Sequence, residues 1–201
     1  MELFVVGAAS AVIGFVLRAL PRSEALEANA KLLEAAGEGK VSTITSLVDS
    51  GVPVDACGEH GETALMVAAG AGQPAAVELL LSLGASIALA ATEGVPITPG
   101  CHLCAGGTCV HAAAASGNEQ ILSMLLERDA AAVRACDVLQ NTPLHAAAAA
   151  GRVSAVQTCL ARGAAPDTRN CTGCTPLALA ASYGGVEAVR LLLEQVRDVN
   201  Q

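Results

Sequence analysis

Apolar residues recur at helical spacing in five successive segments of the chain. Within each segment they stand three or four residues apart or side by side, which places them on one stripe of a helix. The five stripes are Ile44, Leu47 and Val48; Val77, Leu80 and Leu81; Leu122, Leu125 and Leu126; Val156, Cys159 and Leu160; and Val189, Leu192 and Leu193. A helix cannot bury such a stripe alone, so we expect five helices that pack against neighbours.

A second pattern precedes each stripe and repeats along the chain. Its five copies begin at Ala30, Thr63, Thr108, Thr142 and Thr175, which are 33, 45, 34 and 33 residues apart. Alanine occupies the fifth and sixth positions after every start, and glycine the ninth. Alanine favours helices and lets neighbouring helices approach closely, whereas glycine ends a helix. The pattern therefore predicts a helix-turn-helix unit that is repeated five times, each copy stacking on the next.

The fourth copy carries a recognisable motif. Thr142, Pro143, Leu144, His145 and Ala147 match T-P-L-H-x-A, and together with the period this unit resembles the ankyrin repeat. The resemblance implies an all-α solenoid of about five helix-turn-helix repeats with short hairpin loops. We place this domain at residues 27–201, with repeats at about 27–57, 58–87, 104–136, 137–169 and 170–201.

Two segments depart from the regular pattern. Residues 88–103 are an insertion that carries Gly94, Pro96, Pro99 and Gly100, and we expect them to loop out of the stack. The last helix contains residues 191–193, all leucine, followed by little polar sequence, although terminal repeats usually have a polar outer face. We expect that this end is a contact surface or that the chain is a fragment.

Residues 1–22 form an apolar segment unlike the repeats, and we expect a helix there. Every residue from 3 to 17 is apolar or small, and a membrane span needs about 20 such residues, with a lower limit of about 17. Three interpretations stay open: a membrane anchor at residues 3–20, a cap on the first repeat, or a signal peptide. Arg18 and Arg22 follow the apolar run, so an inserted anchor would leave the repeats in the cytosol. We expect a cytoplasmic protein, tethered to a membrane under the first interpretation.

Composition and motifs exclude several classes of protein. Hydrophobic residues make up 53% of the chain and charged residues 15%, which is too apolar for a disordered chain. The formal charge of −8 argues against nucleic acid as a partner. The sequence has no phosphate-binding glycine loop, no HExxH and no nucleophile elbow, so we expect neither catalysis nor a cofactor. Cys171 and Cys174 form a CxxC pair without a βαβ unit, and we interpret them as surface thiols.

A zinc-binding module is the alternative function. Cys101, His102, Cys104, Cys109 and His111 lie within eleven residues, and three thiols with an imidazole could bind zinc tetrahedrally. The resemblance gives a simpler interpretation of two of these residues, because Cys109 and His111 occupy the proline and histidine positions of the repeat motif and would then be structural. We therefore favour no metal site, and Cys101, Cys104, Cys109 and His111 are the candidate ligands of the alternative.

The resemblance also implies a scaffold that binds a partner protein or peptide. The binding surface would be concave and formed by hairpin tips and inner helices. The candidate contact residues are Glu59, His60, Glu62, Leu139, Asn141 and Thr172 in the hairpins, and Tyr183 on an inner helix. Tyr183 is the only aromatic residue in the repeats, so it is either a binding hot spot or a cover for the end of the fifth repeat. A smooth, alanine-lined surface suits an extended peptide or a helix, and the acidic balance favours a basic one.

Overall fold

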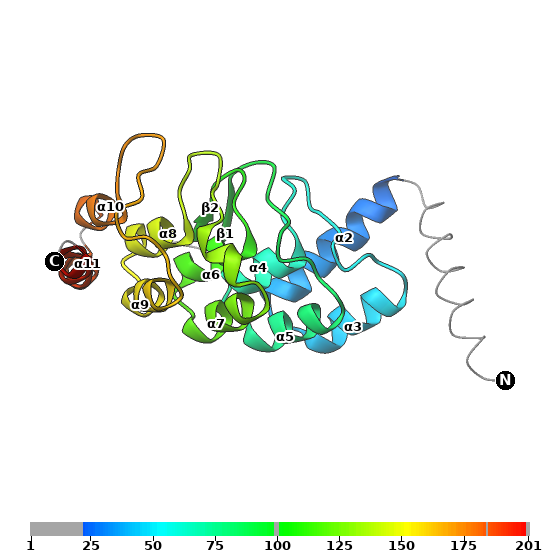
Figure 1. Cartoon of the computed structure of the whole chain (residues 1–201). Coiled ribbons are helices and arrows are strands. Elements are labelled where there is room, and N and C mark those ends of the chain that lie inside the picture. Colours follow the sequence, from blue (N-terminus) through cyan, green and yellow to red (C-terminus); the bar gives the residue numbers. More distant parts are fainter. Residues whose placement is uncertain (1–21, 99–100, 184, 200–201) are drawn as a thin grey trace.

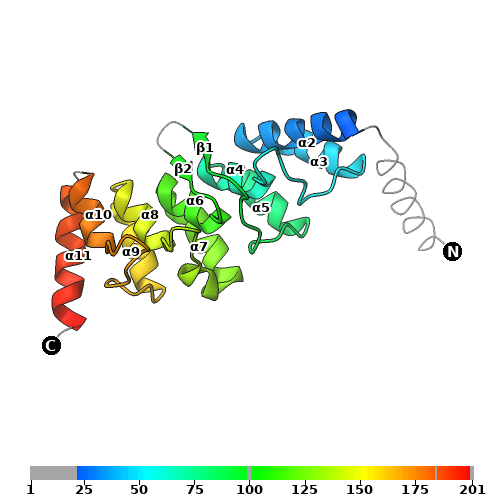
Figure 2. The same cartoon turned by 90° about the horizontal axis from the view of Figure 1, so that it is seen from above.

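The computed structural model describes residues 22–98, 101–183 and 185–199 as two layers of helices (Figures 1 and 2). The inner layer contains α2 (Arg22–Gly37), α4 (Ala64–Gly70), α6 (Cys109–Ser116), α8 (Pro143–Ala149) and α10 (Pro176–Ser182). The outer layer contains α3 (Val41–Asp49), α5 (Pro74–Ser82), α7 (Glu119–Arg128), α9 (Val153–Ala161) and α11 (Val186–Val199), with a 3₁₀ turn, η1 (Ala130–Arg134), after α7. Each helix contacts the next one in its own layer and the other helix of its pair. The predicted solenoid of five helix pairs is confirmed.

The two alanine positions of the repeat lie where the inner helices meet. Nine of the ten alanines are buried, and the tenth, Ala181, is exposed at the end of the stack. The apolar stripes of the outer helices face the same interior, where Ile44, Leu80, Leu125 and Leu192 are fully buried. Small residues on the inner helices and large ones on the outer helices thus form one continuous core.

Threonine begins four of the five inner helices. The hydroxyl oxygen of Thr63 accepts a hydrogen bond from the backbone N–H of Met66, and Thr175 caps α10 in the same way. At the other end of α4 and α8 the chain turns through Gly72 and Gly151, whose φ angles of 70° and 64° are left-handed. Glycine adopts that conformation without a steric penalty, which explains its position nine residues after each start.

The insertion, which was expected to loop out of the stack, folds into a regular structure. Its two arms pair as an elongated hairpin that contains β1 (Val95–Thr98) and β2 (Cys101–Leu103), and we call residues 90–108 the ribbon. Val95 and Leu103 face each other in register and are 8% and 2% exposed. Because β1 contacts α4 and β2 contacts α6, the ribbon lies on the inner layer. The buried pair Val95 and Leu103 explains why the insertion packs on the stack, which the alignment of the repeats did not show.

The first inner helix begins at Arg22, earlier than the first repeat was placed. With 16 residues, α2 is twice as long as α6, because helix continues where the other repeats have a hairpin. In the part of the chain that the structure describes, no helix is long and apolar enough to cross a bilayer. The predicted membrane segment, residues 3–20, lies outside that part, as does all but the last residue of the predicted N-terminal helix.

Candidate functional site

The inner layer carries a groove along α6, α8 and α10. The groove has a volume of about 510 Å³. Its floor is formed by the small or apolar residues Ala115, Ala146, Ala149, Ala150 and Leu179, and its walls by the hairpin residues Gly107, Asp137, Leu139, Asn141, Asn170 and Thr172. Leu103 and Cys104 of the ribbon close one end, and Tyr183 stands at the other. Alanine on the floor keeps the groove open.

The ribbon separates this groove from a second hollow. Figure 2 shows β1 and β2 projecting from the inner layer between α2 on one side and α8 and α10 on the other. Ala115 on α6 is only 6% exposed, whereas Ala149, which occupies the same position on α8, is half-buried. The second hollow, of about 300 Å³, lies between α2 and the hairpin before α4. The inner face therefore offers two separate hollows.

The predicted contact residues divide between these hollows. Leu139, Asn141, Thr172 and Tyr183 line the groove. Glu59, His60 and Glu62 line the smaller hollow, together with Leu26, Ala30, Leu33 and Gly58. Tyr183 and Leu139 are 72% and 45% exposed, so both present apolar surface to the solvent. The structure thus does not bring the seven residues into one site.

Side chains hold the hairpins of the groove in place. The Asp137 carboxylate accepts hydrogen bonds from the backbone N–H groups of Leu139 and Asn141, at 2.9 and 2.8 Å, and from the Asn141 amide at 3.0 Å. The amide oxygen of Asn141 accepts a bond of 2.8 Å from Asn170, whose own oxygen accepts three hydrogen bonds within its hairpin. The amide of Asn141 is therefore occupied in positioning the hairpins, which leaves Leu139 and Thr172 as exposed candidates beside it.

Two buried histidines join successive repeats. The Nδ1 atom of His111 accepts the backbone N–H of Thr108, so its Nε2 carries the proton and donates to the Asn141 carbonyl at 2.9 Å. His145 makes the same bonds to Thr142 and, at 3.2 Å, to the Cys174 carbonyl. Burial lowers the pKa of both histidines below the usual value, which keeps the rings neutral. Each ring therefore links one inner helix to the following hairpin.

The geometry disfavours the zinc alternative. Both ring nitrogens of His111 are already hydrogen-bonded. Cys109 is 1% exposed, and burial raises the pKa of its thiol to about 12. Burial and the neighbouring Asp137 carboxylate raise the pKa of Cys104, and the side chain of Cys101 lies outside the described part of the structure. Among the described residues no three histidine, cysteine or acidic side chains are placed to hold a metal ion.

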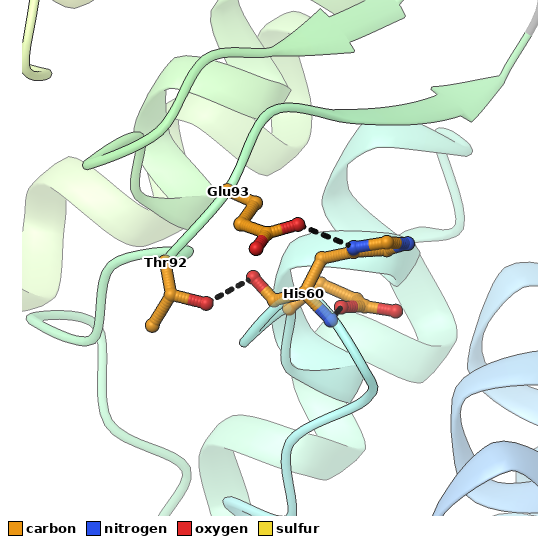
Figure 3. Close-up of polar contacts among 4 residues, drawn as sticks. His60, Thr92 and Glu93 are labelled. Carbon is orange, nitrogen blue, oxygen red and sulfur yellow. Dashed lines mark hydrogen bonds and ion pairs between the residues drawn. The ribbon is translucent and has the colours of Figure 1, made fainter.

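His60 ties the ribbon to the preceding hairpin (Figure 3). Its carbonyl accepts hydrogen bonds from the backbone N–H groups of Thr92 and Glu93 and from the Thr92 hydroxyl, at 2.8 to 3.1 Å. Its Nδ1 atom lies 3.0 Å from the Glu93 carboxylate. The hydrogen bond to Glu93 raises the pKa of His60, and the charges of Glu62 and Glu59 add to the effect. The structure thus gives His60 a role in holding the base of the ribbon.

The sequence interpretation missed the acidic centre of the groove. Asp137 is 7% exposed and none of the ion pairs among the described residues includes it. A signal for its structural role exists, since Asp137 and Asn170 both stand five residues before the threonine of their repeats. Leu103 and Leu179 were also missed, because nothing in the sequence shows which apolar residues of an insertion or an inner helix border a hollow.

Comparison with known proteins agrees with this architecture. The family model described as ankyrin repeats matches residues 21–91, 89–170 and 110–201, which together cover most of the chain. The chain is 34% identical over 178 residues, 88% of its length, to ankyrin repeat and KH domain-containing protein mask-1 of Caenorhabditis elegans. It is 36% identical over 106 residues, 53% of its length, to inactive serine/threonine-protein kinase TEX14 of Bos taurus. In each case it covers about 6% of the relative's length.

Proposed function

Because the chain belongs to the ankyrin repeat family, we propose that it is a scaffold that binds a partner protein in the groove along α6, α8 and α10. Ankyrin repeats are generally protein-interaction modules and are typically not catalytic. The fold alone does not choose the surface, since one fold can carry many functions. The choice of the groove depends on the arrangement of its side chains.

The observation that carries this proposal is a fixed hollow with exposed apolar walls. Leu139 and Tyr183 are exposed on its borders, and the floor between them consists mainly of alanine. The hairpins are held by Asp137, Asn141 and Asn170 before any partner arrives. A surface ordered in advance loses little conformational entropy on binding, which favours affinity. The volume of about 510 Å³ accommodates side chains of a bound segment.

Site-directed photocrosslinking tests the proposal. A benzophenone amino acid replaces Tyr183 at the groove or, as control, the exposed Gln157 on outer helix α9. We expect the partner to be crosslinked from position 183 and not from position 157. Crosslinking from position 157 alone would place the partner on the outer layer and contradict the proposal.

Removal of exposed apolar side chains by alanine substitution gives a second test. Leu139→Ala combined with Tyr183→Ala removes apolar surface from the groove, and we expect partner capture to fall at least about tenfold, as for a hot spot. Leu83→Ala is the matched control, because Leu83 is 36% exposed at the end of outer helix α5. Equal loss of capture in both variants would show that the effect is not specific to the groove.

We also propose that the scaffold acts in the cytoplasm and that residues 3–20 tether it to a membrane. Support comes from the run of apolar or small residues at 3–17 and from Arg18 and Arg22 after it. Cell fractionation of the full chain should place it in the membrane fraction, and Val12→Asp with Val16→Asp should release it. Recovery of the unaltered chain in the soluble fraction would end this proposal.

A further inference from the structure

The charge of the groove has one sign. Among the described residues that line it there is no lysine, arginine or glutamate, and Asp137 is the single acidic one. Asp137 is 7% exposed, and its carboxylate accepts hydrogen bonds from neutral donors and forms no ion pair among the described residues. His111 and His145, the two imidazoles in the lining, donate to backbone carbonyls. A carboxylate without a counter-charge beside apolar walls of low dielectric attracts a cation from the partner.

The smaller hollow has the same bias. Glu59 and Glu62 line it, and none of the lining residues that the structure describes is a lysine or arginine. Nδ1 of His60, the one basic group in that described lining, lies 3.0 Å from the Glu93 carboxylate. A partner segment that extends past the ribbon therefore meets negative charge on both sides of it.

Apolar walls accompany the negative charge. Leu103 and Leu139 border the groove and Leu179 lies on its floor, where the other residues are alanines with little side-chain bulk. The partner must therefore supply the large apolar side chains that fill it. Tyr183 is 72% exposed at the far end, and the face of an aromatic ring attracts a cation.

From these features we infer that the groove binds a short partner segment in which a lysine or arginine adjoins large apolar side chains. The apolar side chains lie among the leucines, and the cation lies toward Asp137 or over Tyr183. This inference rests on the proposed function and adds the chemistry of the partner to it.

Opposite charges placed at one position of the floor test this inference. Ala150 ends α8, is half-buried in the lining and has a right-handed backbone conformation that any residue adopts. Ala150→Lys and Ala150→Glu both fill the groove with a long side chain, but only the first opposes a cation. Ala161→Lys, on the exposed end of outer helix α9, is the charge-matched control.

The probes are peptides selected from a random dodecapeptide library displayed on phage, with the full chain as target. We expect the enriched peptides to contain lysine or arginine within a few residues of leucine, isoleucine or methionine. A synthetic enriched peptide should bind Ala150→Lys at least about tenfold more weakly than Ala150→Glu in dilute salt, and the gap should shrink in concentrated salt. Ala161→Lys should bind it like the unaltered chain.

The possible failures are distinguishable. Acidic or uncharged enriched peptides, or equal weakening by Ala150→Lys and Ala150→Glu, would overturn the inference while leaving the groove as the binding surface. Selection that yields no peptide sensitive to either change at Ala150 would overturn the inference as well. If Ala161→Lys abolished binding and the changes at Ala150 did not, the proposed function itself would fail.

Discussion

Acidification should destabilise the fold through the two buried histidines. His111 and His145 are neutral in the folded chain, and burial lowers the pKa of each. In the unfolded chain a histidine has a pKa of about 6.5. At a pH below the unfolded pKa, the unfolded state binds protons that the folded state does not. The free energy of unfolding is therefore undiminished above the unfolded pKa and falls as the pH is lowered toward the folded pKa.

The size of the effect follows from proton linkage. One pH unit below the unfolded pKa, each neutral buried histidine lowers the free energy of unfolding by at most about 1.4 kcal/mol. Together, His111 and His145 therefore account for a loss of up to about 3 kcal/mol between about pH 7.5 and about pH 5.5. Urea unfolding followed by circular dichroism measures this loss, provided that each transition is cooperative.

A double variant isolates the histidines. In His111→Met with His145→Met, methionine enters a position that Met66 already occupies in the second repeat, 1% exposed. The variant should be less stable at every pH, because the carbonyl partners of the two rings lose their donors at a cost of about 1–3 kcal/mol each. Its stability should nevertheless change less with pH than that of the unaltered chain.

His60, whose side chain is 45% exposed, provides a control in which the effect of pH has the opposite sign. Its pKa is raised by the hydrogen bond to Glu93, so its contribution is present at low pH and is lost as the pH rises through the folded pKa. His60→Gln should therefore make the loss of stability on acidification slightly larger. If the double methionine variant and the unaltered chain showed the same dependence on pH, the assignment to the buried rings would be refuted.

Three further outcomes follow from the packing. Burial raises the pKa of the Cys159 thiol to about 12, so Cys159 should react with iodoacetamide at least about tenfold more slowly than the exposed Cys136. Mass spectrometry measures both rates, and equal rates would contradict the burial of Cys159. Gly107→Ala places a methyl group against Leu103 and should lower the free energy of unfolding in urea by about 1–3 kcal/mol. Amide hydrogen exchange in β2 should also become faster, and unchanged exchange would refute this contact. Asn170→Ala leaves three donors without their acceptor and should lower the free energy of unfolding by about 1–3 kcal/mol, whereas an unaltered urea midpoint would show that the hairpin holds without it.

The repeated part of the fold could be predicted because each copy solves the same packing problem. An alanine such as Ala147 meets the preceding and following inner helices, and the same constraint acts 33 or 34 residues away. Helix starts were marked by threonine, and helix ends by glycines such as Gly72 and Gly151. The period of the sequence therefore predicted every helix pair.

The ribbon and the site could be predicted only in part. The pairing of Val95 with Leu103 has no counterpart in the other described repeats, so no alignment of copies reveals it. The hairpin residues were found by position, but position does not show that Asn141 is hydrogen-bonded on both sides of its amide. The seven contact residues and the membrane segment stay predictions, since their test requires a partner and a bilayer.

The ribbon also limits the length of a straight segment that would fit along the inner helices. A straight, rigid rod laid along all five inner helices would collide with β1 and β2, which stand between α4 and α6 on that face. Rods are therefore limited to the span from α6 to α10, and only a chain that bends around the ribbon can touch both ends of the molecule. For any partner bound on this face, the ribbon would thus restrict the shape of the bound segment, whatever its side chains.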